Sequence, residues 1–158
     1  FNAQEVRDAM LKASSIKQHY RYPSGNTALG ASYYALGIFY RLAPDSFWIE
    51  LFFNVRGDVN LSIGYFEEAR KTKTDQIELY TEMAASQFCK SSREDSVEAA
   101  DDARKSISMC QSIKPKSEID KISQADCALL LTEPSLGCGY SRDRQQETDV
   151  EKFKAIGN

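Results

Sequence analysis

The feature that most constrains this chain is a helical pattern that occurs twice, 34 residues apart. The first copy, GDVNLSIGYFEEARK, runs from Gly57 to Lys71 and opens with a Gly-Asp turn dipeptide. Its apolar side chains Ile63, Phe66 and Ala69 recur at spacings of three, so they lie on one helix face. The second copy, EAADDARK, runs from Glu98 to Lys105, and the offset between the matching alanines is 103 − 69 = 34. A period of this length predicts stacked pairs of helices.

The repeated helix resembles the second helix of a tetratricopeptide repeat, which reads roughly G-D-Y-x-x-A-I-x-Y-Y-x-x-A. The small positions of that family are Ser62 and Ala69 in the first copy and Ser96 and Ala103 in the second. The resemblance covers residues 45–110 and is degenerate, because the closing proline of the family is missing. The first helix of a family repeat carries Trp, Leu and Gly at three fixed positions. The second unit fits these positions, with Tyr80, Met83 and Ala84. The first unit departs from them, with Ser46, Ile49 and Glu50.

This resemblance implies two equivalent hairpins, 47–56 with 59–72 and 75–90 with 94–110, and a concave groove lined by their first helices. Such a groove would hold a peptide or a partner helix through apolar anchors with polar edges. The alternative is a helical bundle in which the repeat is a chance echo, since E-E-A-R-K is a common helix surface. The groove residues implied by the family are Phe47, Leu51 and Asn54 in the first unit and Glu78, Thr81, Ala85 and Phe88 in the second.

The rest of the chain is a succession of helix patterns separated by Gly, Pro and Ser clusters, with no strand of useful length. Asn2 and Glu5 mark a helix start, and because Phe1 takes part in that signal we expect the visible terminus to lie close to the natural one. Segment 27–43 is apolar almost all round, which predicts a central helix covered on several sides. The expected helices are 1–20, 27–43, 47–56, 59–72, 75–90, 94–110, 117–131 and a short one at 149–156.

The sequence therefore predicts a single all-α domain over residues 1–158, with about seven helices stacked as a tetratricopeptide-like bundle. Its parts are an N-terminal helix pair (1–44), the hairpins (45–110) and a C-terminal part (111–158). A chain of 158 residues is long enough for one domain with a real core. The net charge of −3 gives no basic face for nucleic acid, and no run approaches the length of a membrane span. We expect a protein or peptide partner, and the sequence leaves the oligomeric state open.

Four cysteines suggest where the protein is found. An even number in a chain of this size favours two disulfides in an oxidising compartment, so we expect a periplasmic or secreted protein. The alternative is a cytoplasmic protein whose cysteines are buried thiols acting as small hydrophobes. No pair has the C-x-x-C spacing of a zinc or redox site. The four are Cys89, Cys110, Cys127 and Cys138.

Helix direction suggests how these cysteines pair. Cys89 lies at the turn of the second hairpin and Cys110 at the far end of its second helix, roughly 24 Å away, so these two are not bonded. The next helix returns and brings Cys127 towards Cys89. We therefore predict Cys89–Cys127 and Cys110–Cys138. The competing arrangement is Cys127–Cys138 with Cys89 and Cys110 as free thiols.

Candidate chemistry is sparse. His19 is the only histidine, which rules out a histidine-rich zinc site and makes a metal site unexpected. Ser14 and Lys17 have the S-x-x-K spacing of penicillin-recognising serine enzymes, but the companion motifs are missing. We predict no catalytic residue and no cofactor. Glu50 lies within an aromatic helix, where partial burial would raise its pKa and could mark a pocket; the alternative is an exposed or Arg-paired carboxylate.

The sequence thus favours a non-enzymatic protein- or peptide-binding module that is exported and acts as an adaptor or as an inhibitor or immunity-type protein. The alternative is a small helical enzyme or apolar-ligand carrier with an aromatic pocket near Glu50. An open groove would favour the first function, and a closed pocket beside Glu50 would favour the second. The aromatic residues available for such a pocket are Tyr33, Tyr34, Phe39, Tyr40 and Trp48.

Overall fold

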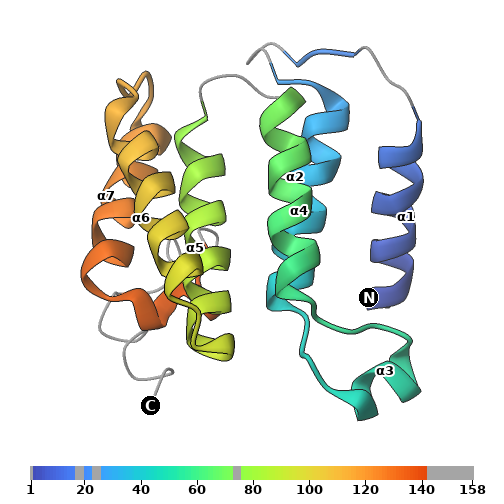
Figure 1. Cartoon of the computed structure of the whole chain (residues 1–158). Coiled ribbons are helices and arrows are strands. Elements are labelled where there is room, and N and C mark those ends of the chain that lie inside the picture. The colour runs from blue at the N-terminus through green and yellow to red at the C-terminus, as the bar shows by residue number, and fades with distance from the viewer. Residues whose placement is uncertain (1, 17–19, 23–25, 73–75, 142–158) are drawn as a thin grey trace.

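Seven α-helices and one short 3-10 helix make up the part of the chain that the computed structural model describes, residues 2–16, 20–22, 26–72 and 76–141 (Figure 1). Within these residues there is no β-strand, only an isolated bridge between Arg21 and Thr27. The predicted all-α class is confirmed. The predicted helix at 149–156 and His19 lie outside the described residues. The elements are α1 (Ala3–Ser15), α2 (Ala28–Leu42), α3 (Phe47–Phe53), α4 (Val59–Thr72), α5 (Ile77–Glu94), α6 (Val97–Ser112), α7 (Glu118–Thr132) and η1 (Pro134–Cys138).

Short polar side chains fix where several helices begin. The Asn2 side chain accepts a hydrogen bond from the Gln4 backbone N–H at 3.1 Å, so the predicted cap of α1 is confirmed. Ser117 and Asp120 form a complete capping box at the start of α7. These local signals satisfy backbone N–H groups that have no partner inside the helix.

Helix ends were predicted less well than helix starts. The predicted helix 47–56 ends at Phe53, because Asn54 adopts a left-handed conformation with φ 49°. Likewise α5 continues to Glu94 and ends at Asp95, with φ 51°. The expected start of the next helix at residue 94 is therefore wrong, because α6 begins at Val97 and is capped by Ser96.

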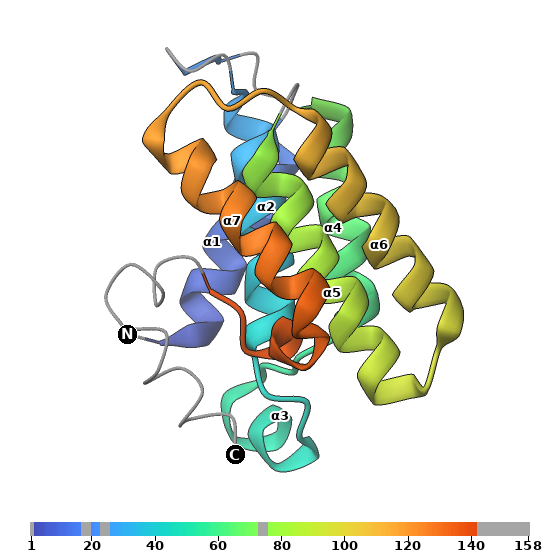
Figure 2. The same cartoon turned by 90° about the vertical axis from the view of Figure 1, so that its left-hand side faces the viewer.

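The helices form two groups joined at α5 (Figures 1 and 2). In the first group α2 packs along α4, and α1 packs on α2. In the second group α5 packs along α6, and both α7 and η1 pack on α5. The groups meet where α4 and α2 contact α5.

This arrangement confirms one predicted hairpin and overturns the other. Helices α5 and α6 are paired as predicted, but α4 is paired with α2 and not with α3. After α3 the chain comes back to the end of α2 before α4 begins. Two backbone hydrogen bonds hold it there: the N–H of Gly57 donates to Pro44 O at 2.9 Å, and the N–H of Asp58 donates to Tyr40 O at 2.9 Å. A Cβ at Gly57 would lie 2.0 Å from the Ala43 carbonyl oxygen, so only glycine allows this return. The two units are therefore not equivalent hairpins.

The central helix is α5 rather than the apolar α2. Eleven of the 18 residues of α5 are buried, whereas α2 buries only Gly30, Leu36, Gly37 and Arg41. The helix at 27–43 contacts α1, α4 and α5, so it is covered on several sides as expected, but most of its residues are only half-buried and it is not the central helix. The main core cluster joins α5, α6, α7 and the segment after η1, and contains Ile77, Ala84, Ala85, Phe88, Ala103, Ile107, Cys110, Cys127, Leu130 and Tyr140.

All four cysteines are bonded, which confirms two disulfides, but the pairs differ from the prediction. The bonds are Cys89–Cys138, with Cα atoms 4.5 Å apart, and Cys110–Cys127, with Cα atoms 6.8 Å apart. The predicted pairs Cys89–Cys127 and Cys110–Cys138 are wrong, and so is the arrangement with Cys89 and Cys110 free. Only the exclusion of Cys89–Cys110 holds.

The pairing was missed because α7 crosses α5 obliquely, starting to one side of α6 (Figure 2). The Gln124 amide donates to the carbonyls of Cys110 and Ile113 at 3.2 and 2.9 Å, so the end of α6 is level with the seventh residue of α7. Cys127 lies one turn further on and reaches Cys110 rather than Cys89. The disulfide partner of Cys89 comes from η1, which packs directly on the second half of α5.

Candidate functional site

The predicted groove residues of the first unit lie on α3, at one end of the molecule (Figure 1). Phe47 and Leu51 are 63% and 61% exposed, and Asn54 is the exposed residue that ends the helix. These residues therefore stand on a free surface, but they line no groove shared with α5.

The predicted groove residues of the second unit are buried, apart from the half-buried Glu78. Ala85 and Phe88 belong to the main core cluster. The Thr81 hydroxyl donates to Ser123 O at 3.1 Å and lies 3.0 Å from the sulfur of Cys127. This face of α5 is covered by α6 and α7, so Thr81, Ala85 and Phe88 do not form a binding surface.

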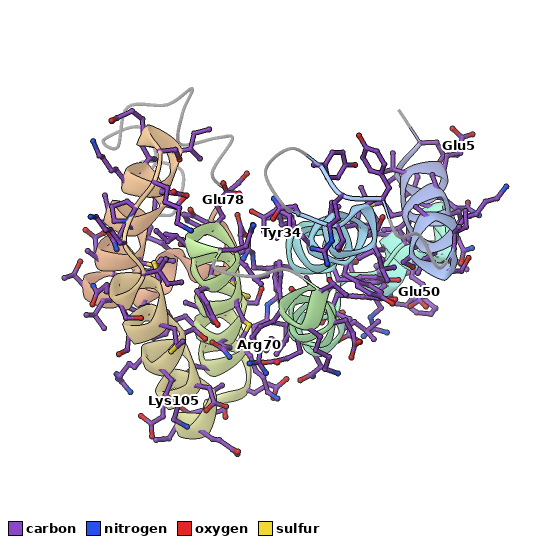
Figure 3. All side chains as sticks on the ribbon, turned by 90° about the horizontal axis from the view of Figure 1, so that it is seen from above. Glu5, Tyr34, Glu50, Arg70, Glu78 and Lys105 are labelled. Carbon is purple, nitrogen blue, oxygen red and sulfur yellow. A yellow bond between two sulfur atoms is a disulfide. The ribbon has the colours of Figure 1, made fainter. Side chains whose placement is uncertain are left out.

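The two halves of the predicted site are also far apart. Figure 3 shows Glu78 on α5 and Glu50 on α3 on opposite sides of the α2–α4 pair. The structure does not bring the seven residues together, because α3 is not the first helix of a hairpin with α4.

Glu50 itself is an exposed, Arg-paired carboxylate, which is the alternative left open by the sequence. Its side chain is 45% exposed, and Oε2 lies 3.3 Å from the guanidinium of Arg56. Arg56 also bonds Asp45 at 2.7 Å, and the hydrogen bond and charge of Asp45, followed by those of Glu50, raise the pKa of Arg56. The possible pocket acid is thus a surface member of a small ion-pair cluster.

A wholly apolar cavity of about 470 Å³ lies between α1, α2 and α3, beside this cluster and open to solvent. None of the seven predicted groove residues lines it. Its volume is in the range of small-molecule sites and would also accept bulky side chains of a partner. The lining residues are Ala3, Met10, Ala35, Ile38, Phe39, Leu42, Ala43, Pro44, Ile49, Phe53 and Val55.

Backbone contacts hold the walls of this cavity in place. The guanidinium of Arg7 on α1 donates to the carbonyl of Asn54 at the end of α3. The return of the chain to α4, fixed by Gly57 and Asp58, ties the other end of α3 to α2. As a result Ile49 and Phe53, one turn apart on α3, face α2.

The aromatic residues proposed for a pocket do not gather in one. Tyr33 and Tyr40 both stack on Tyr65 of α4, with ring centroids 6.2 and 5.6 Å apart. Tyr34 makes an edge contact with Phe66. Of the five, only Phe39 lines the cavity, and Trp48 lies at the surface with 65% exposure.

The outward face of α3 is the most exposed apolar surface among the described helices. Its members recur at positions i, i+1, i+4 and i+5, which places them on the side of the helix away from α2. Each is more than 60% exposed. We call this set the α3 aromatic face: Phe47, Trp48, Leu51 and Phe52.

A buried ionic network joins the two helix groups. Arg41 on α2 is 1% exposed and donates to the carboxylate of Glu82 on α5, to the Glu82 carbonyl at 2.8 Å and to the Tyr140 carbonyl at 2.8 Å. Its guanidinium also lies over the Tyr140 ring, 5.7 Å from the centroid. Burial, then the nearby carboxylates Glu82 and Asp126, raise the pKa of the Tyr140 phenol, which therefore stays protonated. The network is sealed from solvent and serves the fold.

The repeated surface pattern appears in the structure as matching ion pairs. Each pair joins residues three apart on an exposed helix face, with nitrogen–oxygen distances of 2.6–2.8 Å. These acids therefore belong to solvated helix faces. The pairs are Glu67–Arg70 and Glu68–Lys71 on α4, and Asp101–Arg104 and Asp102–Lys105 on α6. Figure 3 shows Arg70 and Lys105 on these two helices.

Within the described ranges no three or more metal-ligating side chains come together. None of the described helices combines the length and apolar character needed to cross a membrane. The two disulfides are consistent with an oxidising, extracytoplasmic compartment. No protein-family model, curated protein or solved structure matches this chain.

Sequence reasoning missed the cavity because its walls come from three separate helices. The sequence of α3 did indicate a binding surface in one respect. This short helix has apolar residues on all sides, so a single neighbouring helix cannot cover all of its apolar surface. The α1 wall, with Ala3 and Met10, gave no such signal, because α1 reads as an ordinary amphipathic helix.

Proposed function

We propose that this protein is a non-enzymatic, exported binding module that takes up an apolar segment of a protein or peptide in the α1–α2–α3 cavity. The observation that carries the proposal is the cavity itself, about 470 Å³, open on one side and lined only by apolar side chains. Recognition by such a groove relies on bulky apolar anchors, with affinity concentrated in a few residues. Adaptor or inhibitor roles both fit this mode.

The surroundings of the cavity support a peptide rather than a reacting substrate. Its lining offers no acid, base or nucleophile, and Glu50 close by is engaged with Arg56. The groove implied by the tetratricopeptide resemblance does not carry the proposal, since Thr81, Ala85 and Phe88 are buried.

A cavity-filling variant tests the proposal. Ala35→Phe on α2 places a ring in the cavity, and Ala125→Phe, on an exposed position of α7, is the matched control. Peptides selected against the wild type from a random displayed library should carry bulky apolar residues at helical spacing. Their affinity should fall at least about tenfold for Ala35→Phe, which is about 1.4 kcal/mol, and stay unchanged for Ala125→Phe. Equal binding by both variants would contradict the proposal.

A second candidate, an apolar-ligand carrier, is favoured by the same lining because no polar group orients a ligand there. Native mass spectrometry of protein purified without detergent distinguishes the two. A bound apolar small molecule that Ala35→Phe displaces would establish the carrier. A ligand-free protein that binds the selected peptides would establish the peptide-binding module.

A further inference from the structure

The α3 aromatic face is separate from the cavity and is covered by no described element. Phe47, Trp48, Leu51 and Phe52 are 63%, 65%, 61% and 72% exposed. Ile49 and Phe53, which follow Trp48 and Phe52 in the chain, line the cavity, and Phe53 is also 62% exposed. A helix of seven residues that presents four large apolar side chains to water on one side has a surface left without a partner.

The size of this face fits a second copy of the chain. A fully exposed aromatic side chain offers about 150–250 Å², so the four residues offer roughly 350–550 Å² per copy. Two such faces packed on each other would bury roughly 700–1,100 Å², which is less than the roughly 1,200–2,000 Å² of a standard interface and within the range of weak, transient contacts. An interface of that size gives a reversible dimer rather than a permanent one. Two-fold symmetry lets the same face serve on both copies.

The charges around the face also fit a second copy better than a lipid surface. The rim holds Arg56 beside Asp45 and Glu50, so it carries both signs, and Arg56 of one copy can face a carboxylate of the other. A lipid-binding helix, in contrast, usually has lysines and arginines beside its apolar face. Arg56 is already paired with two carboxylates, so this part of the rim has no excess of positive charge to attract anionic lipid headgroups.

We propose that the α3 aromatic face is a two-fold homodimer interface. In the dimer, the Trp48 and Phe52 side chains of the two copies pack on each other, and the cavity on the other side of α3 stays open. The proposal does not depend on the proposed function, because the dimer uses the outward residues of α3 and peptide binding uses the inward ones.

Trp48 is the only tryptophan in the chain, so its fluorescence reports on this face alone. Sedimentation velocity and tryptophan emission are measured together from about 1 to about 300 µM, a range that brackets the weak dissociation constant expected for a small interface. The wild type should pass from monomer to dimer, and its emission maximum should move to shorter wavelength over the same range.

Two variants and one control locate the interface. Leu51→Glu and Phe52→Glu each place a charge in the face and should keep the protein monomeric, with Trp48 emission fixed at the exposed value. Val97→Glu, at a residue of α6 that is 75% exposed, should dimerise like the wild type. The cavity variant Ala35→Phe should also dimerise, so a failure of the peptide proposal is distinguishable from a failure of this one. Circular dichroism confirms that all variants keep their helices.

Three outcomes would overturn the inference. The first is a wild type that remains monomeric at the highest concentration. The second is a dimer that Leu51→Glu and Phe52→Glu leave intact, which would place the interface elsewhere. The third is an emission shift of the monomer with phosphatidylcholine vesicles but none with concentration, which would assign the face to lipid.

Discussion

The α5–α7 side of the molecule and the α1–α3 side bury their apolar residues in different ways. On the first side, eleven residues of α5 are buried and two disulfides tie the surrounding segments together. On the second side, α1 and α3 have no buried residue, and an open apolar cavity is lined by residues of α1, α2 and α3. Both sides belong to one chain of ordinary composition, so the difference lies in how the helices cover one another.

This contrast shows that apolar content does not decide which helix is central. Helix α2 is far more apolar in sequence than α5, yet α5 is the more buried. Helix α5 carries Thr81, Glu82, Ser86 and Gln87 into the interior because each finds a hydrogen-bond partner there. The apolar residues of α2 and α3 instead stay largely half-buried or exposed.

The largest expected effect tests whether the two sides depend on each other. Arg41→Met removes the cation that links α2 to Glu82 and Tyr140, leaving a buried carboxylate without its partner. We expect a loss of about 3–5 kcal/mol in the free energy of unfolding, measured by denaturant titration. The control Arg104→Met breaks an exposed pair with Asp101 and should cost less than about 1 kcal/mol. Equal losses in the two variants would show that the sides are not coupled through Arg41.

The next effect concerns the disulfides of the rigid side. Replacing Cys89 and Cys138 by serine opens a bond between residues 49 apart, and replacing Cys110 and Cys127 opens one between residues 17 apart. Chain-entropy arguments give losses of roughly 4 and roughly 3 kcal/mol, because the longer loop gains more freedom on unfolding. Each double variant keeps the other bond, which peptide mapping without reductant verifies. A greater loss from the shorter loop would mean that native packing, rather than chain entropy, dominates.

A smaller effect compares one alanine from each group. Ala69 and Ala103 are both fully buried and lie 34 residues apart, one on α4 and one on α6. A leucine at either position overpacks a helix contact and should cost about 1–3 kcal/mol. We expect Ala103→Leu at the upper end, because its neighbours form the dry core, and Ala69→Leu at the lower end, because half-buried Tyr33 and Tyr34 lie beside it. Thermal unfolding in parallel measures the order, and full stability in both variants would contradict their role as interface positions.

The smallest expected effect lies on the exposed side. Phe52→Ser removes a ring that is 72% exposed and contributes little to the folded monomer. The free energy of unfolding at low protein concentration should change by less than about 0.5 kcal/mol. Phe66→Ser on α4, a residue with no exposed area, serves as the contrast and should cost several kcal/mol. A large loss from Phe52→Ser would show that α3 supports the core.

Local signals in the sequence predicted the elements well and their packing poorly. The cap of Asn2 depends on a few adjacent residues, and periodicity predicted each of the seven described α-helices. The partner of α4 was missed because it depends on the backbone turn at Asn54 and on the close approach at Gly57. The disulfide pairs were missed because they depend on the angle at which α7 crosses α5, and the spacing of residues in the sequence does not indicate that angle. The 34-residue period reflected exposed ion pairs such as Glu67–Arg70 and Asp101–Arg104, which constrain solubility more than architecture.

The sequence did not predict the candidate cavity, because none of the seven predicted groove residues lines it. Phe47 and Leu51 are exposed on α3, outside the cavity. Thr81, Ala85 and Phe88 were predicted to line a groove, but they are buried because α7 and η1 pack on α5. The spacing of residues within α5 does not show where α7 and η1 lie. The apolar cavity needs three helices at once, so a reading of single helices does not reveal it.

The contact of Arg41 with Tyr140 also sets an order of events during protein synthesis. The two residues are 99 positions apart, and Glu82 leaves the ribosome long before Tyr140 does. At about 5–20 residues per second, synthesis of the stretch between Glu82 and Tyr140 takes on the order of 3–12 s. Until this segment has been made, Arg41 lacks the carbonyl and ring of Tyr140, and Cys89 lacks its disulfide partner Cys138. A chain that stops before Tyr140 therefore lacks a residue that helps to bury the Arg41–Glu82 pair.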